Sequence, residues 1–170
     1  MSHIWKTTGF TADVFVAVDD ASALPTGQAV LVSLKRWRTA RAELLALEVP
    51  VGVVLEPTTD FDPVADALKK LDAIVIPFAK FTDGRGYSLA RRLRDEFHFN
   101  GEVRASGDVL SDQIPLMLRC GFDAFAITHA PTVHALQLGR LPSVPAVYQT
   151  ATHGRRRTIV APHAVLEAAE

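Results

Sequence analysis

Five short apolar runs, rich in β-branched residues and regularly spaced, constrain the fold of this chain most strongly. They are Ala29–Leu34, Val51–Leu55, Ala73–Phe78, Glu102–Ser106 and Ala124–Thr128. Most of them are nearly continuous in apolar character, which is typical of strands buried on both faces of a parallel sheet. Their first residues lie 22 to 29 positions apart, the spacing of repeated strand–helix units. The pattern therefore predicts an α/β fold with a mainly parallel sheet.

Helical patterns occupy the intervals between these runs. The predicted helices are Thr39–Leu47, Asp62–Leu71, Ser88–Phe97, Ser111–Cys120 and Pro131–Leu138. We expect Thr39 to be the N-cap of the first helix, and Asp62, which precedes a proline, to be the N-cap of the second. An additional strand is predicted over Ala12–Val18, paired at an edge of the sheet with Ile4–Thr8.

The number of predicted strands limits the architecture. About five strands cannot close an eight-stranded barrel within one chain. Two arrangements are compatible: a partial (β/α)-barrel that hides its open side against a second copy, and an open, doubly wound three-layer sheet. The strand–glycine–helix–glycine–strand rhythm of residues 103–127 favours the partial barrel. We expect a single α/β domain over residues 1–170, with its core units in about 29–140 and an irregular C-terminal tail over about 141–170.

Charge and cysteine content restrict the class of protein. Lys and Arg number 18 against 19 Asp and Glu, a formal charge of -1, so the chain has no overall attraction to nucleic acid or to anionic lipid. The single cysteine, Cys120, excludes an intrachain disulfide and favours a reducing compartment. No apolar stretch reaches the roughly 18 residues that cross a bilayer. We therefore expect a cytoplasmic protein without a nucleic-acid or membrane partner.

Polar side chains follow the predicted strands, at the end where parallel α/β folds place their working residues. They are Lys35, Arg36, Glu56, the segment from Lys80 to Ser88, Asp108 (which follows Gly107) and His129. If the strands are correct, these residues meet on one rim. Asp108 is a candidate acid or base, and His129 could carry protons near neutral pH. The structural alternatives are a loop cap for Asp108 and an ordinary packed histidine for His129.

The segment that begins at Asp83 is the most unusual. Gly84 and Gly86 flank Arg85, which predicts a sharp turn with exposed amides just before a helix N-terminus. Such amides, together with the helix dipole, favour an anion. The predicted anion- or substrate-binding residues are Lys80, Gly84, Arg85, Gly86, Tyr87, Ser88, Arg91, Arg104 and Gly107, and the predicted catalytic residues are Asp83, Asp108 and His129. The alternative is a loop whose glycines serve only the turn and whose Asp83 or Ser88 caps the helix.

Arg104 lies inside a strand-like run, where an arginine is costly to bury unless it is paired. A structural ion pair with Asp83, Asp108 or Asp123 is the favoured interpretation, and a ligand contact at the rim is the alternative. The six histidines are scattered, and neither H-E-x-x-H nor C-x-x-C occurs, so no metal site is predicted. No G-x-G-x-x-G or P-loop motif occurs either, and the sequence assigns no cofactor.

Two long blocks, FTDGRGYSLARRLR and GEVRASGDVLSDQIPLMLRCGFDAFAI, resemble a bacterial family of uncharacterised proteins described as oxidoreductases of sulfite reduction. VSLKRW near the start and VYQ near the end extend the resemblance over most of the chain. The family's genes commonly lie beside those of assimilatory sulfite reductase and phosphoadenylyl-sulfate reductase. The resemblance therefore implies a part in cytoplasmic sulfur assimilation, with sulfite reductase as a partner. It brings no assigned catalytic residues.

Three functions are compatible with these observations. The resemblance implies an accessory protein or oxidoreductase that acts with sulfite reductase. The glycine-flanked Arg85 and the predicted rim indicate instead an enzyme or binding protein for a small oxyanion or a phosphorylated metabolite. The partial barrel indicates a homodimeric structural module, because an open sheet edge needs cover.

Overall fold

A single eight-stranded sheet organises the structure, a computed structural model that describes residues 3–58, 62–80 and 82–142. Its strands are β1 (His3–Lys6), β2 (Gly9–Ala12), β3 (Phe15–Val18), β4 (Ala29–Ser33), β5 (Val51–Val54), β6 (Ala73–Phe78), β7 (Glu102–Gly107) and β8 (Ala124–Ile127). Its helices are α1 (Leu34–Leu45), α2 (Asp62–Ala65), the 3₁₀ helix η1 (Leu68–Lys70), α3 (Arg85–Asp95), α4 (Ile114–Arg119) and α5 (Ala130–Gln137). The predicted tail lies outside the described residues from position 143 onward.

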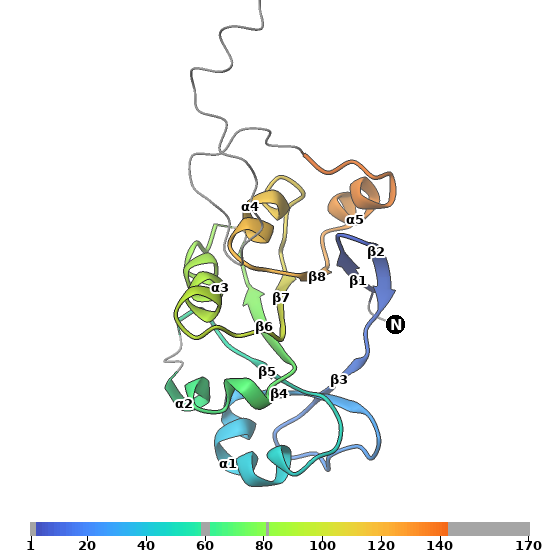
Figure 1. Cartoon of the computed structure of the whole chain (residues 1–170). Helices are drawn as coiled ribbons and strands as arrows, with labels where there is room; N and C mark the ends of the chain where they lie inside the picture. The colour runs from blue at the N-terminus through green and yellow to red at the C-terminus, as the bar shows by residue number, and fades with distance from the viewer. Residues whose placement is uncertain (1–2, 59–61, 81, 143–170) are drawn as a thin grey trace, which may run out of the picture.

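The order of the strands makes the sheet curl into a half-barrel. Strands β3 to β8 are parallel and lie side by side in chain order, and the antiparallel hairpin of β1 and β2 extends the sheet beyond β8. Because every crossover then runs in the same direction, all the helices cover one face, as in a (β/α)-barrel. Figure 1 shows α1 to α5 around the outside of the curl, with the open side between β2 and β3. The partial barrel is confirmed, and the open doubly wound sheet, which needs helices on both faces, is not formed.

The two faces of the sheet have different roles. Side chains of Val32, Val53, Ile74, Val103 and Phe125 point outward and are buried with the helices in the main apolar core. The alternate residues point to the inner face of the curl. There, a Cβ added to Gly52 would lie 3.3 Å from the Phe15 ring, 3.3 Å from the Ala73 Cβ and 3.1 Å from Leu31. The inner face is therefore packed by side chains near the amino ends of the strands.

The helices differ from their predicted ranges, and α1 and α2 differ most, whereas α3 begins at Arg85 rather than Ser88 and α4 at Ile114 rather than Ser111. Helix α1 begins at Leu34, not at Thr39, because β4 runs directly into it and the Ser33 Oγ accepts a hydrogen bond from the Arg36 amide at 3.0 Å. Thr39 lies inside the helix, and its hydroxyl donates to the carbonyl of Arg36 at 3.1 Å. The predicted helix Asp62–Leu71 is split into α2 and η1. Strand runs are therefore better marked in this sequence than helix starts.

The predicted strand Ala12–Val18 is also split. The Asp13 carboxylate accepts a hydrogen bond from the amide of Phe15 at 3.0 Å, a local turn that interrupts the apolar run. Residues up to Ala12 pair with β1, whereas Phe15–Val18 pair in parallel with β4. The predicted pairing with Ile4–Thr8 is therefore wrong, because only Ala12 of the predicted strand lies in β2, and its register partner is His3. The rest forms β3, at the opposite edge of the sheet.

The helices of the described residues are too short or too polar for a membrane span. Within the same residues, no group of three or more His, Cys, Asp or Glu side chains is arranged to hold a metal ion.

Candidate functional site

The carboxyl ends of β6, β7 and β8 form one side of the predicted rim. The amide of Asp108 donates to the Phe78 carbonyl at 2.9 Å, and the Thr128 hydroxyl donates to the Gly107 carbonyl at 3.0 Å. These bonds hold the three strand ends together, and Lys80 and His129 extend from them. His129 precedes α5, and its Nδ1 lies 2.8 Å from the Thr132 hydroxyl, which is buried. Asp108 and His129 thus share a rim, as expected, but the structure gives His129 a helix-start role.

Arg85 is already paired within the glycine-flanked segment. Its Nε and a terminal nitrogen donate to the two Asp83 carboxylate oxygens at 2.8 and 2.7 Å, and its amide donates to the same carboxylate at 3.2 Å. Gly84 has ordinary helical angles, and Gly86 lies in the first turn of α3, where an added Cβ would be 2.5 Å from the Phe78 ring. The predicted sharp turn is therefore absent, and Gly86 instead lets α3 approach β6 closely.

We expect the carboxyl group of Asp83 to titrate with a pKa of about 2, because the hydrogen bonds from Arg85 favour its charged form. In Arg85→Ala the pKa should return toward the ordinary value of 3.8. Side-chain carboxyl NMR shifts followed against pH would measure both values. An unchanged pKa in the variant would contradict the pairing. At neutral pH this carboxyl is ionised, which makes it unsuitable as a general acid.

The remaining predicted residues on α3 do not share one site: Ser88 and Arg91 line a surface pocket on the helix, and Tyr87 does not line it. The Tyr87 ring lies 5.7 Å from that of Phe78, and burial raises the pKa of its hydroxyl to about 12. Ser88 is exposed, and Arg91 pairs with Asp95 one turn later at 3.3 Å. The structure therefore does not gather Tyr87, Ser88 and Arg91 into an anion site at the rim.

Arg104 has a structural environment on the inner face of the sheet. It is 3% exposed, and its guanidinium contacts the carboxylates of Asp13 and Glu102 at 2.9 and 2.7 Å. The Phe15 ring lies 5.3 Å from the guanidinium carbon, and Lys6 contacts Glu102 at 2.6 Å. A structural ion pair is the observed arrangement. The predicted partners are wrong, because these carboxylates belong to Asp13, in the turn before β3, and to Glu102, two residues away.

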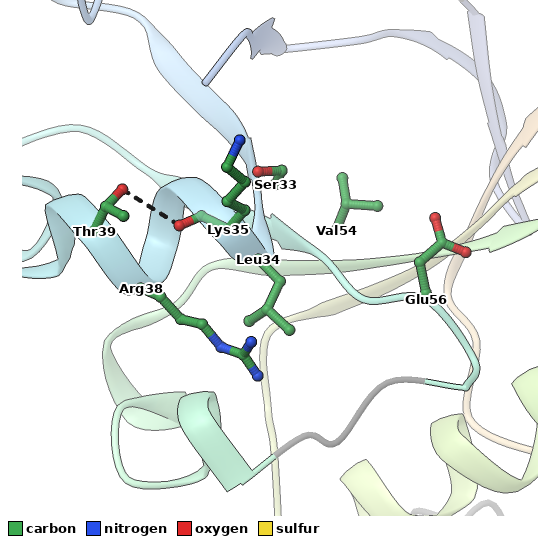
Figure 2. Close-up of a pocket in the computed structure, with 7 residues that line it drawn as sticks. All are labelled: Ser33, Leu34, Lys35, Arg38, Thr39, Val54 and Glu56. Carbon is green, nitrogen blue, oxygen red and sulfur yellow. Dashed lines mark hydrogen bonds between the residues drawn. The ribbon is translucent and has the colours of Figure 1, made fainter. Parts of the chain in front are cut away.

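A cavity of about 450 Å³ lies at the ends of β4 and β5, on the other side of the rim (Figure 2). Its lining residues are Ser33, Leu34, Lys35, Arg38, Thr39, Val54 and Glu56. Ser33 and Val54 are register neighbours at the ends of their strands, and Glu56 continues two residues beyond Val54. Leu34 and Arg38 are one helical turn apart on α1, so they lie on the same helix face. We call this the rim cavity.

The charges of the rim cavity fall into two groups. The Lys35 ammonium lies 3.2 Å from the Asp20 carboxylate, which also accepts from the Ser33 hydroxyl. The hydrogen bond from Ser33, followed by that from Lys35, holds the pKa of Asp20 below its ordinary value. The side chains of Arg38 and Glu56 have no hydrogen-bond or ion-pair partner among the described residues. Figure 2 shows them on different walls, Arg38 on α1 and Glu56 at the end of β5.

The sequence indicated part of the rim cavity. Lys35 and Glu56 were expected at the rim as residues that follow strands. Ser33, Arg38 and Thr39 were missed, because the helix was expected to start at Thr39. The available signal was a serine at the end of an apolar run, the usual N-cap pattern.

The sequence model of a family described as "Bacterial protein of unknown function (DUF934)" matches residues 52–159. The matched range begins in β5, so it contains Val54 and Glu56 of the rim cavity, whereas Ser33 to Thr39 precede it. No curated protein matches the chain.

Proposed function

We propose that this chain, which belongs to the DUF934 family of bacterial proteins of unknown function, is an accessory protein of assimilatory sulfite reduction that binds a small oxyanion. The observation that carries the oxyanion site is the Arg38 guanidinium, which lines the rim cavity without a carboxylate partner among the described residues. The connection to sulfite reduction is supported by the resemblance of the blocks from Phe81 to Arg94 and from Gly101 to Ile127 to proteins described in that way.

The donors around Arg38 are suited to an oxyanion. A guanidinium presents five N–H groups in a fixed geometry that matches sulfur and phosphorus oxyanions. Lys35 adds an ammonium, which has three donors and is engaged in one ion pair, with Asp20. Arg85, the arginine favoured by the sequence, is less suited, because Asp83 already occupies its guanidinium. The proposed site is therefore the rim cavity.

We expect Arg38→Ala to weaken the binding of sulfite, sulfate or phosphate by about 2 kcal/mol, roughly thirtyfold in Kd, as for a lost charged hydrogen bond. Isothermal titration calorimetry on the full chain would measure it, with adenosine phosphosulfate in the same series. Arg85→Ala is the matched control, since it removes an exposed arginine outside the cavity, and it should leave Kd unchanged. Equal binding by the wild type and Arg38→Ala would contradict the site.

The accessory role has its own test. Purified sulfite reductase would be titrated with the chain, and both binding and the turnover of sulfite would be followed. A protein that neither binds the reductase nor changes its turnover would not be its accessory.

The volume of the cavity favours a second candidate function. At about 450 Å³ it is large enough for a metabolite that carries the oxyanion. The alternative is therefore an enzyme or binding protein for a phosphorylated or sulfonated metabolite. In either case we propose that a second copy of the chain covers edge strand β3. Val16 in this strand is 42% exposed, and Val14 just before it is 67% exposed.

A further inference from the structure

We infer that the rim cavity selects a zwitterion: a small molecule whose oxyanion is held by Arg38 and whose amino group is held by Glu56. This inference rests on the proposed oxyanion site and specifies the class of its ligand. It concerns Glu56, a charged residue of the cavity lining to which the proposed function assigns no role.

The first reason for a zwitterionic ligand is the charge balance of the cavity. Lys35 and Asp20 neutralise each other at 3.2 Å. Among the residues that the structure describes, the charges of the cavity left for a ligand are one guanidinium, on Arg38, and one carboxylate, on Glu56. A bare oxyanion would satisfy Arg38 but would lie in the same cavity as an unpaired carboxylate, which opposes it. A ligand with one positive and one negative charge can pair with both Arg38 and Glu56.

The second reason for a zwitterionic ligand is that the two charged residues belong to different elements. Arg38 projects from α1, and Glu56 follows the end of β5, so different elements hold them (Figure 2). Unlike Arg85 and Asp83, which contact each other at 2.7 Å, they form no ion pair. Each charge therefore remains available to a separate group of one ligand.

The floor between the two walls indicates what joins those groups. Leu34 and Val54 line the cavity and are half-buried, so they offer apolar surface to a short carbon chain. The predicted ligand class is an amine joined by a few carbons to a sulfonate, a phosphate or a carboxylate.

Two isosteric pairs test the inference on the full chain. Taurine is compared with 1-propanesulfonate, and phosphoethanolamine with propyl phosphate, because each pair exchanges an ammonium group for a methyl group. We expect the amine of at least one pair to bind about tenfold or more tightly than its isostere, as for a charged contact. Glu56→Gln should reduce this preference to about twofold or less and leave the affinity for the isostere unchanged or improved. Glu48→Gln, an exposed glutamate outside the cavity, should retain the full preference.

The outcomes separate this inference from the proposed function. If the isosteres bind as tightly as the amines, or if Glu56→Gln keeps the preference, the zwitterion is overturned while the oxyanion site stands. If Arg38→Ala leaves the binding of every probe unchanged, the oxyanion site falls as well. Calorimetry that detects none of the four probes at millimolar concentration would overturn both.

Discussion

Replacing Gly107 by alanine is expected to lower the free energy of unfolding by about 3 kcal/mol or more, as the sum of backbone strain and a backbone clash. Gly107 ends β7 with a φ of 96°, a conformation that residues with a side chain rarely adopt. An added Cβ would also lie 2.5 Å from the carbonyl oxygen of Phe78. That oxygen accepts the Asp108 amide at 2.9 Å, so it cannot move without breaking the bond between the ends of β6 and β7. Urea-induced unfolding followed by circular dichroism would measure the loss.

A second glycine separates strain from clash. Gly27 has a φ of 70°, but an added Cβ there would meet nothing within 4 Å. Gly27→Ala should therefore cost only the strain, about 1 kcal/mol. The difference between the two variants measures the contact with Phe78. If Gly107→Ala were no more destabilising than Gly27→Ala, the close approach of the strand ends would be refuted.

Replacing Arg104 by methionine is expected to lower the free energy of unfolding by about 3–5 kcal/mol, the usual cost of breaking a buried ion pair. Methionine retains much of the length of the side chain but leaves the Asp13 carboxylate, 2.9 Å away in the native protein, without its counter-charge. Glu102 would lose one partner and keep Lys6, at 2.6 Å. The loss should be visible in chemical unfolding at neutral pH.

A double-mutant cycle shows how much of this loss of stability comes from leaving the Asp13 carboxylate without a counter-charge. Asp13→Asn removes the charge, so the variant with both Arg104→Met and Asp13→Asn should be more stable than the sum of the two single effects. Arg85→Met is the exposed control, and no resolvable destabilisation is expected from it, because solvent screens that pair. Strict additivity in the Arg104–Asp13 cycle would show that the two side chains do not interact energetically.

The Gly107→Ala and Arg104→Met variants also test which contacts keep the half-barrel curled. Asp13 lies between β2 and β3, at the open side of the sheet, whereas Arg104 lies on β7 near its centre. Their ion pair crosses the inner face and ties the open side to the middle of the sheet. Gly107 acts at the carboxyl rim, where it brings β6 and β7 together. Neither residue lines the rim cavity, so their effects should appear in stability before they appear in binding.

Local patterns were sufficient for the parallel strands β4 to β8. Ala73–Phe78 was predicted with the bounds observed for β6, and the other four runs agree with β4, β5, β7 and β8 to within one residue at each end. The reason is that a strand covered on both faces must be apolar at nearly every position. Helix starts were less predictable, because the sequence around Ser33 and Arg36 is as compatible with a loop after a strand as with a helix start. Their bond at 3.0 Å exists only when β4 runs straight into α1.

The sequence by itself determined the fold class, because regularly spaced, continuously apolar runs allow little besides a parallel sheet with crossover helices. It also determined that polar residues would follow those runs. The tertiary structure alone decided which of them are free to act. Asp83 neutralises Arg85 at 2.7 Å, and Asp13 approaches Arg104 from 91 residues away. Arg38 and Glu56 line one cavity and have no partner within the described part of the chain. Pairing depends on the curl of the sheet and on the exact start of α1, and charges that are distant in sequence meet only when the chain has folded.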